Sequence, residues 1–277
     1  MLHNQTLRAT LLSVVLLVLA LGAWELSISA PPAGSGELSE YEQMMGAAAS
    51  RAGVPPPSVI LAHAMDELSR PFYDAGPNDK GIGLQLGYSV ARVMAGYLLA
   101  AMLAIPLGFV IGMSPLLNRA LDPYIQILKP ISPLAWMPLA LFVIKDSSLS
   151  AIFVIFICSI WPMLINTAFG VASVKRDWLN VARTLEMSRL RTAFTVILPA
   201  AAPTILTGMR IAIGISWLVI VAAEMLVGGT GIGYYVWNEW NNLDLASVVF
   251  AIIMIGLVGM VLDAVLAQAS RLVRYQD

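Results

Sequence analysis

The segment that decides the fold class is residues 147–174, SSLSAIFVIFICSIWPMLINTAFGVASV, which carries no charged residue between Asp146 and Lys175. A helix needs about 20 mostly apolar residues to cross the hydrocarbon core of a bilayer, and this run is longer than that. A second uncharged run, residues 93–118, lies between Arg92 and Arg119. The sequence therefore predicts two membrane-spanning helices here.

Three further spans are predicted in the same part of the chain. The stretch 192–223 contains one charge, Arg210, and residues 245–262 contain none. Residues 120–144 include four prolines and Lys129. Because proline removes a backbone donor and a buried charge is costly in lipid, this span is predicted to be a kinked helix supported by protein neighbours.

A sixth span is predicted at residues 9–28, close to the N-terminus. The same stretch also fits a secretory signal, since Arg8 is a short basic flank and residues 27–30 resemble a cleavage site. We expect it to be retained as an anchor, because its uncharged run is long for a signal and a multispanning chain follows. The predicted fold class is an all-α membrane protein with six transmembrane helices.

The composition excludes several classes of protein. Hydrophobic residues make up 58% of the chain and charged residues 12%, whereas soluble chains carry about 25% charge. This excludes a nucleic-acid-binding domain, a disordered tail and an ordinary cytosolic enzyme. One cysteine, Cys158, allows no intrachain disulfide and no CxxC site. Only two histidines, His3 and His63, are present, so a histidine-based metal site or intramembrane metalloprotease is not expected.

The orientation is predicted from the Lys and Arg residues of the connections. With a cytoplasmic N-terminus, nine fall inside and four outside, which favours cytoplasmic termini. The inside residues are Arg8, Arg119, Lys175, Arg176, Arg183, Arg189, Arg191, Arg271 and Arg274, and the outside residues are Arg51, Arg70, Lys80 and Lys145.

The long acidic connection 31–84 then lies outside. Within it, three prolines at 55–57 open an amphipathic run, residues 59–68, that Pro71 ends; we expect a helix on the outer membrane surface with His63 as a solvated interfacial residue.

Two glycine-containing patterns resemble nucleotide sites without completing one. Residues 76–81 match the start of a P-loop but lack its Lys-Ser/Thr, and the glycines of 229–233 follow a membrane span rather than a strand. We interpret 229–233 as a flexible outer turn beside an aromatic belt. The belt residues are Tyr234, Tyr235, Trp237 and Trp240. The chain shows no means of binding ATP.

The connection 171–202 is far longer than a tight turn. Its apolar residues recur at the spacing of one helical face, and polar residues occupy the other. The first set is Trp178, Val181, Ala182 and Leu185; the second is Asn180, Arg183, Thr184 and Glu186. Two interpretations are open, a helix on the membrane surface or a helix that fits a groove on a cytoplasmic partner.

Residues 180–199, NVARTLEMSRLRTAFTVILP, resemble the cytoplasmic "EAA" loop of ABC importer permeases. That pattern is Glu-Ala-Ala, three residues, Gly, nine residues, Ile, one residue and Leu-Pro. Here the triplet is Asn180-Val181-Ala182, Glu186 replaces the glycine, and Leu198-Pro199 match. The Glu186 departure puts the usual tight turn in doubt and predicts a helix that continues to about Arg189.

A wider resemblance covers roughly residues 70–270. It is carried by 71–83 (PFYDAGPNDKGIG), 130–139 (PISPLAWMPL) and 222–229 (AAEMLVGG). These motifs are similar to the nitrate, sulfonate, taurine and bicarbonate branch of type I importer permeases, most of all to the cyanobacterial-type nitrate/nitrite permeases. Bicarbonate permeases share them almost equally, so bicarbonate and sulfonate or taurine remain alternative substrates.

The resemblance implies the type I permease fold, five core helices plus an N-terminal helix, in a bacterial inner membrane. It implies a second permease subunit, two cytoplasmic ATPase subunits that bind ATP, a periplasmic binding protein, membrane lipid, no nucleic acid and no cofactor on this chain. The segments expected are 1–30 (N-terminal span), 31–84 (periplasmic loop), 85–270 (core, with coupling loop 171–202) and 271–277 (tail). The coupling residues would be Trp178, Asn180, Val181, Ala182, Arg183, Leu185 and Glu186.

Ionisable residues at membrane depth mark candidate positions of the translocation pathway. Lys129 and Arg210 are predicted to give it a positive lining, although Arg210 also fits snorkelling to the inner interface. Glu224 is predicted to pair with Lys145 or Arg92 or to act at a gate hinge. Aromatic lining by Trp136 and Trp217 is also expected.

A secondary transporter is the main alternative class. It too would use broken helices and buried charges, but it would need internal inverted repeats, which the six unequal spans do not show.

Overall fold

The computed structural model describes residues 2–29, 54–76 and 79–273, and this part of the chain is helical, with one isolated bridge between Asp74 and Lys80 in place of a strand. The expected tail beyond residue 273 and most of the acidic connection, residues 30–53, lie outside the described residues. The helices are α1 (Leu2–Ser29), α3 (Pro57–Ser69), α4 (Ile82–Met113), α5 (Pro115–Leu128), η2 (Pro133–Trp136), α6 (Met137–Ile144), α7 (Ser147–Ala172), α8 (Arg176–Thr184), α9 (Arg189–Thr192), η3 (Ala193–Ile197), α10 (Leu198–Val227), α11 (Ile232–Asn241) and α12 (Leu245–Val273).

The predicted spans are confirmed among the described residues. Five helices are long and apolar enough to cross a membrane, in α1, α4, α7, α9–α10 and α12. A sixth span results if α5 and the η2–α6 segment are counted together, and these two pieces meet at 81°. The predicted kink is therefore a sharp break. Pro130 and Pro133 lie at the break, where each removes a backbone donor and restricts the residue before it.

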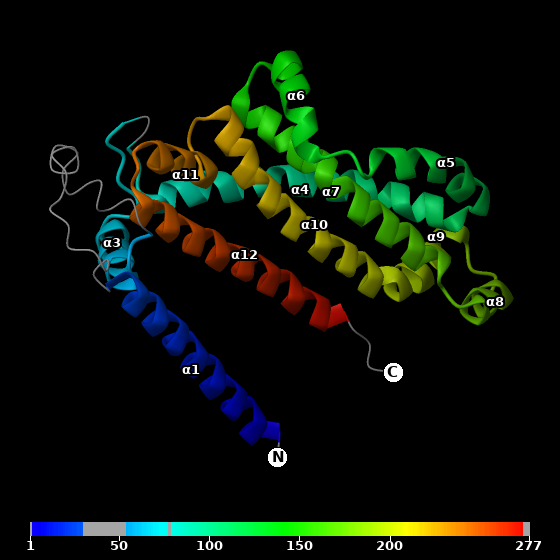
Figure 1. Cartoon of the computed structure of the whole chain (residues 1–277). Helices are drawn as coiled ribbons and strands as arrows, with labels where there is room; N and C mark the ends of the chain where they lie inside the picture. Colours follow the sequence, from blue (N-terminus) through cyan, green and yellow to red (C-terminus); the bar gives the residue numbers. More distant parts are fainter. Residues whose placement is uncertain (1, 30–53, 77–78, 274–277) are drawn as a thin grey trace, which may run out of the picture. The chain divides into compact units, whose positions relative to one another are not determined.

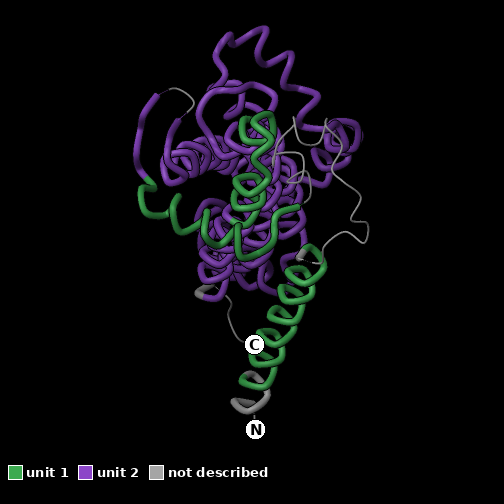
Figure 2. The backbone as a smooth tube through the Cα atoms, turned by 60° about the vertical axis from the view of Figure 1, so that its left-hand side comes forward, with its two compact units in different colours: residues 1–71, 238–253 green, residues 72–237, 254–277 purple. Residues whose placement is uncertain are grey.

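The chain forms two compact units, coloured separately in Figure 2: residues 1–71 with 238–253, and residues 72–237 with 254–277. In the second unit α7 packs against both α4 and α10 (Figure 1). Close approach of α4 to α7 depends on small residues, because a Cβ at Gly108 would lie 2.8 Å from the Cβ of Thr167.

Two span boundaries predicted from charge-free runs are wrong. Helix α4 begins at Ile82, so Arg92 lies inside the helix, and α12 continues past Asp263. Both charges are neutralised by partners on α10, Arg92 by Glu224 and Asp263 by Arg210. A paired charge does not end a span, which is why the uncharged intervals gave the wrong limits.

In the first unit the amphipathic run is confirmed as helix α3. Its Ser58 hydroxyl donates to Glu25 Oε1 of α1 at 2.8 Å. His63 Nε2 lies 2.9 Å from the Ser247 hydroxyl, and the His63 ring packs edge-on against Phe250 at 5.9 Å. The prediction that His63 is simply solvated is therefore wrong, since it joins α3 to the start of α12.

Candidate functional site

A buried ion pair joins α4 and α10. Arg92 Nη1 lies 2.7 Å from Glu224 Oε1, and the Glu224 side chain is 3% exposed. Of the two predicted partners of Glu224, Arg92 is therefore the one that pairs with it. Lys145, the other, is exposed and lies at the end of α6, where its φ is 58°. Because a buried carboxylate is costly when it is alone, this pairing explains how Glu224 is accommodated within a spanning helix.

The ion pair is the centre of a larger polar cluster. The Ser89 hydroxyl lies 2.8 Å from Glu224 Oε2, and the Gly233 amide donates to the same oxygen at 3.0 Å. Arg92 also donates from Nε to the Ser148 hydroxyl at 2.8 Å and from Nη1 to the Thr230 carbonyl. We call these residues, with Gln85 and the turn 228–233, the Glu224 cluster. It connects α4, α7, α10 and the start of α11.

The turn 228–233 is fixed by the same cluster. The Gly231 amide donates to Gln85 Oε1 at 2.7 Å, and the Ile232 amide donates to the Ser89 hydroxyl at 2.9 Å. A Cβ at Gly231 would collide with the Glu224 carboxylate, so the glycine is required there. The expectation of a flexible turn is therefore wrong. Tyr235, expected in an aromatic belt, is buried in the protein.

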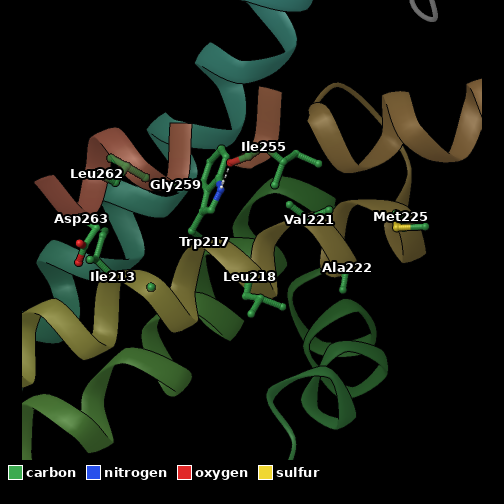
Figure 3. A pocket seen from close by; sticks show the side chains of 11 residues that line it. Ile213, Trp217, Leu218, Val221, Ala222, Met225, Ile255, Gly259, Leu262 and Asp263 are labelled. Atoms are coloured by element: carbon green, nitrogen blue, oxygen red, sulfur yellow. Dashed lines mark hydrogen bonds between the residues drawn. The ribbon is translucent and has the colours of Figure 1, made fainter. Parts of the chain in front are cut away.

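Arg210 is also paired within the spans. Its Nε and Nη2 both donate to the carboxylate of Asp263 on α12 at 2.5 Å, and each side chain is about half exposed. Beside the pair, α10 and α12 border an apolar cavity of about 440 Å³. Figure 3 shows Trp217 on its wall, with the indole N–H donating to the Ile255 carbonyl at 2.9 Å. The positive charge of Arg210 is neutralised at this face.

Lys129 borders a second cavity, of about 340 Å³. Its lining comes from the broken span, α7 and α10, and includes Lys129, Pro133, Trp161, Asn166, Ile211 and Ile215. Trp136 belongs to η2 in the same broken span. Its indole nitrogen is buried and has no hydrogen-bond partner within the described residues. Trp136 and Lys129 therefore lie on either side of the break, and the Lys129 side chain is exposed.

Helix α8 presents an apolar surface at the end of α7. Trp178, Val181 and Leu185 are 45%, 59% and 68% exposed, whereas Ala182 is 2% exposed. The predicted apolar face is thus divided: Ala182 packs inward, and the other three form an exposed surface that we call the α8 stripe. Lys175 Nζ lies 5.4 Å above the Trp178 ring. Asn180, Arg183 and Glu186 are exposed around it.

A tight turn follows α8, contrary to the prediction that the helix continues to Arg189. The helix ends at Thr184, and Glu186 adopts a φ of 50°, in the left-handed region. The Met187 amide donates to the Ala182 carbonyl at 3.0 Å and closes the turn. Glu186 therefore adopts the conformation that glycine favours, so the departure from the family pattern does not remove the turn.

The comparisons with known proteins agree with this arrangement. Residues 104–275 match the family described as binding-protein-dependent transport system inner membrane component. The chain belongs to this family. The permease is 45% identical to the nitrate import permease protein NrtB of Synechocystis over 220 residues, 79% of this chain and 80% of the relative. It is 48% identical to NrtB of Leptolyngbya laminosa over 218 residues, 78% of each chain.

Two further comparisons concern the substrate and the fold. The permease is 42% identical to the bicarbonate transport system permease protein CmpB of Synechocystis over 223 residues, 79% of this chain and 80% of the relative. Its fold matches a chain of the inward-facing MetNI methionine ABC transporter with a TM-score of 0.60 at 13% identity, covering 68% of this chain and 94% of that one. The permease therefore has the type I importer fold.

The residues predicted as functional lie in four separate places in the permease. Glu224 belongs to the Glu224 cluster, and Arg210 pairs with Asp263, which lines the α10–α12 cavity together with Trp217. Lys129 borders the second cavity, and Trp136 lies in η2 of the same broken span. The coupling residues lie on α8 and its turn. Arg92 was predicted as one of two possible partners of Glu224, but Ser89 and Gln85 were missed. A spacing of four and three residues puts all three on one face of α4, and this polar face was the available signal.

Proposed function

We propose that this permease is the membrane subunit of an ATP-driven importer of a small inorganic anion, and that the anion is nitrate. The observation that supports this most directly is the similarity over about four fifths of the chain to permeases named for nitrate import. Bicarbonate is the second candidate, because the permeases named for bicarbonate transport are nearly as similar. ATP would be bound by partner subunits, and this chain would carry no cofactor.

The α8 stripe is the proposed contact with the ATPase. Helix α8 is short and ends at the turn that contains Glu186. It exposes three apolar side chains next to basic residues. An amphipathic helix of this kind inserts its apolar face into a groove of its partner. We further propose that an external binding protein delivers the anion, and that both termini lie in the cytoplasm of a bacterium, with the spans in its inner membrane.

The substrate is tested in proteoliposomes containing the complete complex with its ATPase and binding protein. We expect nitrate, presented on the binding-protein side, to stimulate ATP hydrolysis and to be taken up with ATP. Bicarbonate and taurine at the same concentration are the comparison anions. Stimulation by bicarbonate alone would assign the permease to the second candidate, and stimulation by neither inorganic anion would reject the proposal.

The complex is expected to contain two permease subunits, most simply two copies of this chain. A single chain offers five core spans, which do not enclose a path symmetrically between two ATPase subunits. Native mass spectrometry of the purified complex measures this number. A monodisperse and active complex with one permease chain would contradict it.

A further inference from the structure

The α10–α12 cavity and the second cavity differ in the charge of their surroundings, and this difference suggests where an anion crosses. At the α10–α12 cavity the charges of Arg210 and Asp263 neutralise each other. At the second cavity Lys129 is the one charged residue among the lining residues described by the structure. Of these two cavities, the second therefore offers an anion a net positive charge from the residues that the structure describes.

Lys129 differs from Arg92 and Arg210, the two cations that are paired within the spans. Arg92 and Arg210 each pair with a carboxylate, but within the described ranges Lys129 makes no ion pair. It lies at the C-terminal end of α5, at the break of the span. An ionised group at membrane depth is costly unless a partner or water compensates it. A bound anion would provide that compensation.

Two further side chains at the cavity carry N–H donors. Trp161 lines it, and in the described part of the chain its indole N–H has no protein acceptor. Asn166 donates one amide N–H to the Pro162 carbonyl at 2.8 Å and has a second N–H available. Ile211 and Ile215 of α10 provide apolar walls. The cavity thus combines one positive charge, a few donors and a largely apolar surface.

We propose that this cavity is a transit site for one small monovalent oxyanion, with Lys129 as its charged contact and Trp161 and Asn166 as hydrogen-bond donors. This proposal rests on the proposed function and adds the place in the permease where the anion binds. One cation surrounded by apolar walls suits a weakly hydrated monovalent anion such as nitrate better than a strongly hydrated or divalent one. Binding by so few groups is weak, which allows release.

The first test measures transport in the reconstituted complex. Lys129→Gln is expected to reduce nitrate uptake about tenfold or more, because a charge-assisted contact is lost. Lys129→Arg, which keeps the charge, should retain most of the uptake. Arg119→Gln is the matched control, since it removes a cation from the same helix α5 outside the cavity lining.

The second test measures the cavity without transport. Ile211→Cys is introduced into a Cys158→Ser background, and the new thiol is modified with anionic and with cationic methanethiosulfonate reagents. Sodium nitrate should slow modification more than sodium chloride at the same ionic strength. Lys129→Gln should abolish this protection and lower the rate for the anionic reagent relative to the cationic one.

The outcomes separate this site from the proposed function. If the unaltered complex takes up no nitrate, the proposed substrate is wrong. If the unaltered complex transports nitrate but Lys129→Gln does so at the same rate, or if nitrate gives no protection at Ile211→Cys, the transit site is wrong. An equal loss of uptake in Arg119→Gln would also overturn it, because the effect would then not depend on the cavity.

Discussion

Leu185→Asp and Trp178→Ala are each expected to abolish copurification of the ATPase subunits with the permease, while the amount of permease in the membrane stays unchanged. Both side chains belong to the exposed α8 stripe. Removing an aromatic anchor from the centre of an interface commonly costs about 2 kcal/mol or more, and an aspartate in an apolar groove adds the cost of burying an unpaired charge. Affinity purification through a tagged ATPase measures the effect.

Leu190→Asp provides the matched control for these variants. Leu190 is 74% exposed, about as much as Leu185 at 68%, but it follows the turn at Glu186 and is not part of the α8 stripe. We expect this variant to keep its ATPase subunits. Normal copurification of Leu185→Asp would contradict the proposed contact, and equal loss in Leu190→Asp would assign the effect to the connection as a whole rather than to the α8 stripe.

The sequence predicted the spans because their signal is local. A run of about 20 apolar residues is sufficient to identify a spanning helix, and the prolines of residues 130–138 similarly locate the break. Tertiary partners are not local. Glu224 lies 132 positions beyond Arg92 in the chain, so no window around Arg92 shows that its charge is neutralised inside α4. Asp263, the partner of Arg210, was not predicted for the same reason, since the two residues are far apart in the sequence.

The turn after α8 illustrates a second limit. A non-glycine residue with a positive φ is uncommon, and glutamate gives no sequence signal for it. At Glu186 the free-energy cost of the positive φ is offset by two hydrogen bonds that close the turn. The Glu186 amide donates to the Arg183 carbonyl, and the Met187 amide donates to the Ala182 carbonyl. The position of the turn was therefore set by backbone hydrogen bonding and by inward packing of Ala182, neither of which a residue pattern reports.

The Glu224 cluster gives the second large expected effect. Glu224→Gln, nearly the same size as the native side chain, should lower the free energy of unfolding by about 3 kcal/mol or more, because Arg92, whose side chain is 14% exposed, is left without its counter-charge. The turn 228–233 should loosen at the same time, since glutamine offers one acceptor oxygen in place of the two that receive Arg92 and the Gly233 amide. Thermal unfolding of the purified permease in detergent measures the loss as a lower Tm.

A double-mutant cycle separates the ion pair from simple loss of packing. The Arg92→Gln and Glu224→Gln double variant removes both charges, so it should be less destabilised than the sum of the single variants, with a coupling of about 1 kcal/mol or more. Asp74→Asn is the control. The Asp74–Lys80 pair is even shorter, at 2.5 Å against 2.7 Å, but Asp74 is 53% exposed, so we expect an unchanged Tm. Additive effects of Arg92→Gln and Glu224→Gln would show that the two side chains act independently. In that case the hydrogen bonds to Ser89 and Gly233, rather than the ion pair, would hold α4, α10 and the turn together.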